Sequence, residues 1–186
     1  MQIHLREIII GIIIIVLLVF GWIFALNIIP PEEMETVEYI DAESYSGQWY
    51  SVYEIPVYYG FYPFGFDSTK CEDSQAYYEV MDNGNIKVKN SCMYESENRI
   101  VEGEAWFAES EPNGKLWVSF NPLFKSPYYI IGIDENYNWS IVGTPDRDSL
   151  WFLSRSSSLT NDDYNEMVLI SENHGFNCEK LTEVKR

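Results

Sequence analysis

The stretch QAYYEVMDNGNIKVKNSCM, residues 75–93, predicts a β-hairpin. Aromatic and β-branched residues gather on both sides of Asp82-Asn83-Gly84, and an Asn-Gly pair between two such runs is typical of a tight hairpin turn. Runs of the same kind recur along the chain between turn signals. The strand candidates are 48–55, 75–81, 86–93, 100–108, 116–120, 128–134, 139–142 and 150–155. Their regular spacing favours an antiparallel meander over β-α-β units.

One helix candidate follows the last of these strands. Thr160 can cap a helix whose apolar stripe includes Met167 and Ile170, and Gly175 ends it. One helix cannot cover both faces of an eight-stranded sheet, whereas closing the sheet into a barrel removes its edges. We therefore expect an all-β fold, an eight-stranded antiparallel up-and-down β-barrel with one C-terminal α-helix. Its interior would hold either packed side chains or one small ligand.

The N-terminal segment 8–29 is uncharged and consists mostly of Ile, Val, Leu and Phe. As a helix it reaches across a hydrocarbon core of about 30 Å, so we expect a transmembrane signal anchor. A cleaved signal sequence and a buried core helix remain alternatives. Arg6 precedes the segment and only acidic charges follow closely, which predicts a cytoplasmic N-terminus and a domain on the extracytoplasmic side of the membrane. The expected division is a cytoplasmic stub (1–7), the anchor (8–29), an acidic tether (30–42) and one domain (43–186).

The charge balance excludes one class of partner. The chain carries 12 basic and 29 acidic residues, a formal net charge of −17, which repels phosphate backbones. We therefore expect no nucleic-acid partner. The cysteine spacings fit no zinc pattern and the chain has only two histidines, so we expect no metal site and no cofactor. Asn138 begins a glycosylation sequon whose use depends on the host.

Three cysteines in an exported chain predict one disulfide and one free thiol. Cys71 and Cys92 lie near the open end of the hairpin described above, which favours a bridge between them. Pairing of Cys178 with either partner stays open.

The start of the first strand, Tyr45-Ser46-Gly47-Gln48-Trp49-Tyr50, resembles the Gly-x-Trp signature of lipocalins. The later run GTPDRDSLWFLSR, residues 143–155, resembles the lipocalins of the bacterial outer-membrane and apolipoprotein D type. The resemblance covers about residues 43–182 and implies the barrel inferred above. It also implies that Gly47, Trp49 and Arg155 are structural, with Trp49 closing the bottom of the barrel and Arg155 lying across its indole ring.

The resemblance and the alternation of side chains along strands together give a candidate ligand site. Counting from Trp49 places Ser51, Tyr53 and Ile55 inside, and counting from Arg155 places Trp151 inside. The expected ligand-binding residues are Tyr53, Tyr78, Val88, Asn90, Val118, Phe120 and Trp151. The amide of Asn90 either pairs with Tyr78 or a neighbouring backbone group, or meets a polar group of the ligand.

These residues predict a membrane-tethered carrier rather than an enzyme. The interior lacks an inward Cys and a Ser-His-Asp set, while its aromatic side chains suit a small hydrophobic or amphiphilic ligand such as a fatty acid or lysophospholipid. Such a carrier would serve the maintenance of membrane lipids. The alternative is an envelope or cell-surface interaction module that uses the barrel as a scaffold. The aromatic loop 56–74 would pack over the mouth, act as a lid or dip into a membrane, and the oligomeric state stays open.

Overall fold

The computed structural model describes residues 33–59, 66–108 and 113–186. The chain divides into two compact units, Met1–Glu33 and Met34–Arg186, and every element described below belongs to the second. The expected anchor 8–29 lies outside the described residues. Within those residues, no helix is both long and apolar enough to cross a bilayer.

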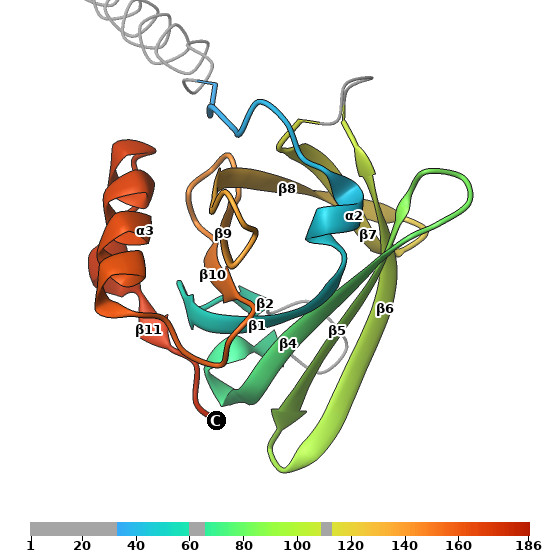
Figure 1. Ribbon diagram of the computed structural model, residues 1–186. Coiled ribbons are helices and arrows are strands. Elements are labelled where there is room, and N and C mark those ends of the chain that lie inside the picture. Colours follow the sequence, from blue (N-terminus) through green and yellow to red (C-terminus); the bar gives the residue numbers. More distant parts are fainter. Residues whose placement is uncertain (1–32, 60–65, 109–112) are drawn as a thin grey trace, which may run out of the picture. The chain divides into compact units, whose positions relative to one another are not determined.

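An antiparallel barrel forms the body of the second unit (Figure 1). Each long strand pairs with the next along the chain, and the last pairs back with the first. The long strands in the described residues are β1 (Gly47–Glu54), β4 (Cys71–Val80), β5 (Ile86–Tyr94), β6 (Glu97–Phe107), β7 (Lys115–Asn121), β8 (Phe124–Ile133), β9 (Trp139–Gly143) and β10 (Leu150–Ser154). The expected eight-stranded antiparallel barrel is confirmed.

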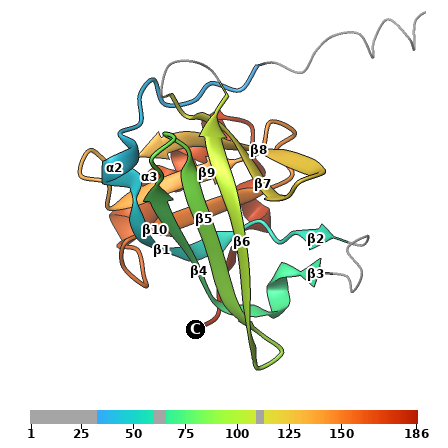
Figure 2. The same ribbon diagram turned by 90° about the vertical axis from the view of Figure 1, so that its right-hand side faces the viewer.

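Several short strands and helical turns flank the barrel. The strand β11 (Thr182–Glu183) pairs with the end of β1, and β2 (Tyr58–Tyr59) pairs with β3 (Phe66–Asp67) outside the barrel (Figure 2). Single helical turns are α2 (Ala42–Tyr45), η1 (Ser68–Lys70) and η2 (Cys178–Lys180). The expectation of an irregular loop over 56–74 is therefore only partly right, because β2, β3, η1 and the start of β4 fall within it. Residues 60–65 of that loop lie outside the described part of the chain.

The two ends of the barrel differ. The segment before β1 crosses the end where β1 begins, because the backbone of Val37 bonds with Gly114 and Ile130 and the Tyr137 hydroxyl accepts from the Asp41 N–H. We call this the closed end. At the opposite end, interior-facing positions such as Val101 and Phe120 remain exposed, at 49% and 39%. We call it the open end.

The C-terminal helix α3 (Asn161–Asn173) packs on the outside of β8 and β9 (Figure 1). The hydroxyl of Thr160 accepts from the Asp163 N–H at its start, and Gly175 follows its end with a φ of +84°, a conformation that favours glycine. The fully buried Met167 anchors the helix. A second core, which includes Ile141 and Phe152, lies between the helix and the barrel wall, separate from the barrel interior.

A bulge in β1 changes which of its side chains point inward. Ser51 lies opposite Leu153, but Tyr53 lies opposite Phe152, so the strand contains one extra residue between these pairs. Beyond the bulge Tyr53 packs against Tyr164 of α3, with ring centroids 4.7 Å apart, and Ile55 joins the same outer core. The expectation that Tyr53 and Ile55 point inward is therefore wrong, because simple alternation does not survive an inserted residue.

The disulfide between Cys71 and Cys92 forms, with the Cα atoms 5.5 Å apart, and joins β4 to β5 at the open end. Cys178 is free, and its thiol lies 3.9 Å from the carbonyl oxygen of Val168 in α3. Burial raises the pKa of this thiol to about 11, so it stays protonated at neutral pH. The favoured pairing is confirmed, and the alternatives that involve Cys178 are wrong.

Candidate ligand-binding site

The floor of the barrel is built around Trp49, which is fully buried. Its indole N–H donates to the carbonyl oxygen of Tyr45 at 2.7 Å, and the guanidinium of Arg155 lies 3.8 Å from the centre of its rings. Gly47 precedes it with a φ of +95°, where a Cβ would lie 3.4 Å from the Arg155 Nη1. These three residues therefore close one end of the barrel and leave no room there for a ligand.

Above this floor, four hydroxyl groups form a buried chain. The Tyr128 hydroxyl lies 2.8 Å from that of Tyr78 and 2.9 Å from that of Tyr45, which in turn lies 3.3 Å from the Ser140 hydroxyl. Ser140 donates to the carbonyl oxygen of Gly132 at 3.5 Å. Burial raises the pKa of Tyr45 to about 12 and raises those of Tyr78 and Tyr128 as well, so all three phenols stay neutral.

A cavity of about 10 Å³ lies beside this chain. Its walls combine the rings of Tyr45, Tyr78 and Tyr128 with aliphatic side chains that include Val88 and Val118. A volume of that size holds about one water molecule. The lower half of the barrel is therefore packed, and an amphiphile would need to occupy the upper half.

The remaining predicted site residues are distributed along the upper half. Trp151 is half-buried and packs against the interior core. Asn90 and Phe120 face the same interior from β5 and β7 but are exposed at the open end. The structure thus brings Tyr78, Val88, Val118 and Trp151 together around one interior, leaves Asn90 and Phe120 at its mouth, and places Tyr53 outside it.

Sequence reasoning missed Glu54. It lies opposite Trp151 across the β1–β10 ladder, and directly opposite residues of an antiparallel pair project from the same face. Its side chain is buried and forms a hydrogen bond with the Ser68 hydroxyl; burial raises the pKa of its carboxyl above the ordinary value. Simple alternation from Trp49 assigns residue 54 to the outside, so only knowledge of the bulge could have found it.

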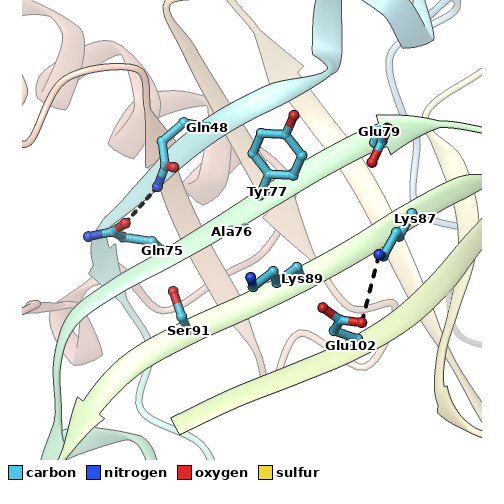
Figure 3. Close-up of a pocket in the computed structure, with 9 residues that line it drawn as sticks. All are labelled: Gln48, Gln75, Ala76, Tyr77, Glu79, Lys87, Lys89, Ser91 and Glu102. Carbon is cyan, nitrogen blue, oxygen red and sulfur yellow. Dashed lines mark hydrogen bonds and ion pairs between the residues drawn. The ribbon is translucent and has the colours of Figure 1, made fainter. Parts of the chain in front are cut away.

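A larger hollow of about 410 Å³ lies on the outer face of β1, β4, β5 and β6, away from the barrel interior (Figure 3). Its walls are polar: Gln48 donates to Gln75 at 2.7 Å, and Lys87 lies 3.8 Å from Glu102. The exposed ring of Tyr77 stands between them. Opposite charges offset each other there, so this surface lacks the apolar lining that a lipid tail requires.

The described residues contain no group of three or more His, Cys, Asp or Glu side chains that could hold a metal ion. A closed barrel with a packed floor, an open end and interior aromatic side chains defines a class of proteins that bind small ligands inside the barrel.

Comparison with known proteins agrees with this class. The family model of the lipocalin-like domain matches residues 40–186, and the chain belongs to the lipocalin family. Over 160 residues it is 32% identical to the outer membrane lipoprotein Blc of Citrobacter freundii, covering 84% of this chain and 85% of that protein. Over 153 residues it is 31% identical to apolipoprotein D of Mus musculus, covering 78% and 76%.

Solved structures show the same fold. Insecticyanin from the tobacco hornworm Manduca sexta superposes with a TM-score of 0.63 at 18% identity, covering 83% of this chain and 85% of that one. Family membership supports binding of a small hydrophobic ligand, and lipocalins are binding and transport proteins, so the prediction of a non-enzymatic function is confirmed.

Proposed function

We propose that the protein carries one amphiphile, such as a fatty acid or lysophospholipid, in the upper half of its barrel. The observation that carries this proposal is the contrast between the two halves. The floor is filled around Trp49, whereas interior-facing side chains at the other end, Phe120 among them, remain exposed. An apolar tail would lie against Trp151 and Phe120, above the packed floor.

Membrane tethering belongs to the same proposal. The apolar segment 8–29 would anchor the chain, and of the expected tether 30–42 only the residues before Met34 would link anchor and barrel, because Val37 and Asp41 are bonded to the barrel. Two findings support an extracytoplasmic position. The Cys71–Cys92 disulfide is typical of an oxidising compartment, and the Blc relatives are named as outer membrane lipoproteins.

The test uses full-length protein kept soluble in amphipol, titrated with brominated fatty acid and brominated lysophospholipid. Bromine quenches a tryptophan only at close range, so uptake gives saturable quenching that reports on Trp151. We expect the saturable part to disappear in Trp151→Phe and to persist in Trp117→Phe, whose ring faces Lys125 outside the interior. A folded protein without saturable quenching would instead support the interaction module.

A further inference from the structure

The wall formed by β1 and β10 carries two polar groups that the apolar interior does not require. Ser51 and Leu153 form one directly opposite pair, and Glu54 and Trp151 form the next pair toward the open end. Leu153 belongs to the interior core and Trp151 packs against it, so Ser51 and Glu54 face the interior as well. The bulge makes them consecutive interior positions of β1 although two residues separate them.

Both groups are buried without a full set of partners. Ser51 is 5% exposed, and its hydroxyl has no hydrogen-bond partner within the described residues. Glu54 is 6% exposed, and the described partner of its carboxyl is the Ser68 hydroxyl alone. A carboxyl group offers about four acceptor positions, so one hydroxyl leaves most of them unused.

Among the described residues, no cation pairs with this carboxyl. Burial and the Ser68 hydroxyl, and no charged neighbour, determine the pKa of Glu54. Arg155 lies over Trp49 at the floor, and Arg99 lies over Tyr94 at the open end, 3.9 Å from its ring centre. Arg186 donates to the Ser51 carbonyl oxygen and pairs with Asp73. A buried acceptor without a counter-ion is costly unless a hydrogen-bond donor reaches it.

We propose that Glu54 and Ser51 form the head-group subsite of the barrel, and that this subsite selects amphiphiles whose head donates hydrogen bonds, alcohols and amines, over free fatty acids. The inference rests on the carrier function proposed above and assigns its ligand class. An amine or hydroxyl would donate to the Glu54 carboxyl while the Ser51 hydroxyl completes its bonding, and the tail would lie along Trp151. A carboxylate head would bring a second acid against a carboxyl that has no cation beside it.

The experiment compares dodecylamine, dodecanol and dodecanoic acid, which share one tail and differ only in the head. Each is titrated into full-length protein in amphipol as a competitor of a brominated amphiphile whose saturable quenching is already established. We expect the amine and the alcohol to bind at least about tenfold more tightly than the acid, the effect of one buried hydrogen bond to a charged or strongly polar group.

Two variants locate the effect. Glu54→Gln should weaken amine binding by about tenfold and strengthen acid binding, and Ser51→Ala should lower alcohol binding severalfold. Glu79→Gln removes the same charge from the exposed outer face and should change none of these values. Thermal unfolding of each variant establishes that it is folded before binding is compared.

The outcomes separate this inference from the carrier function. Equal binding of the three probes, or equal effects of Glu54→Gln and Glu79→Gln, overturns the head-group subsite and leaves the carrier intact. Absence of saturable binding for every probe, in a protein that unfolds cooperatively, overturns both. Preference for the acid overturns the subsite and reverses the assigned ligand class.

Discussion

The guanidinium of Arg155 lies over the rings of Trp49, 3.8 Å from their centre, and the same group donates to the carbonyl oxygens of Ser44 at 2.8 Å and Gln48 at 2.8 Å. One side chain from the end of β10 therefore holds the indole of β1, the single helical turn before it and the first residues of the strand. Because β10 and β1 are the strands that close the barrel, this contact lies across the closing seam.

Replacing Arg155 should weaken the seam. Arg155→Ala removes a cation–π contact and three charge-assisted hydrogen bonds, the third to the carbonyl oxygen of Tyr137, so we expect the free energy of unfolding to fall by about 2–4 kcal/mol. Arg155→Lys keeps the charge but lacks the planar fork of donors that reaches several carbonyl groups at once. Its free energy of unfolding should fall by about half as much. Urea denaturation followed by tryptophan fluorescence measures both. Equal stability of Arg155→Lys and wild type would show that the forked geometry is unimportant.

The buried tyrosine chain predicts an order of effects. The Tyr128 hydroxyl has two tyrosine partners, whereas that of Tyr78 has one. Tyr128→Phe leaves the hydroxyls of Tyr78 and Tyr45 each short of a partner and should lower the free energy of unfolding by about 2–3 kcal/mol, whereas Tyr78→Phe should lower it by about 1 kcal/mol. Chemical denaturation of the single and double variants tests this. The double variant also removes the Tyr78 hydroxyl that Tyr128→Phe leaves unpaired, so a double variant as stable as Tyr78→Phe alone agrees with this prediction. A Tyr78→Phe protein less stable than Tyr128→Phe would contradict the order.

Glu54 should make stability depend on pH. Burial raises the pKa of its carboxyl in the folded protein above its ordinary value of 4.5, so the folded state binds this proton more tightly than the unfolded chain does. The contribution of Glu54 to the free energy of unfolding is therefore most favourable below pH 4.5 and falls as the pH rises through the raised pKa. Glu54→Gln lacks this titration and should gain stability relative to wild type as the pH rises from 4 to 8.

The control for that experiment is Glu79→Gln, which removes one carboxyl from the exposed outer face. Denaturation curves for wild type and both variants are compared across the same pH range. If the difference between Glu54→Gln and wild type stays constant from pH 4 to pH 8, the carboxyl does not sit in the buried environment described above.

The disulfide should stabilise the open end. Its cysteines are 21 positions apart, and closing a loop of that length stabilises a folded chain by about 3 kcal/mol in the chain-entropy description. We expect Cys71→Ser with Cys92→Ser to lower the melting temperature by several degrees, and reductant to do the same to wild type. Cys178→Ser, which leaves the bridge intact, serves as the matched control. A melting temperature that reductant leaves unchanged would contradict this prediction.

Much of this architecture could be predicted from periodicity and turn signals. The hairpin around Asp82-Asn83-Gly84 pairs as β4 and β5, and Thr160 caps the helix. The failure at Tyr53 has a specific physical origin. A bulge changes the phase of alternation by one residue, and no residue type between Ser51 and Tyr53 marks its position, since Val52 is an ordinary strand former. This shift of one position places the ring of Tyr53 outside the interior and the carboxyl of Glu54 inside it.

The chain reaches the barrel through Val37 and Asp41, which contact it at the closed end, opposite the mouth. The longer strands, of eight to eleven residues, run between the two ends and are about 26–36 Å long. The segment that leads into the barrel therefore leaves the mouth unobstructed, and a ligand on its way in would not meet it.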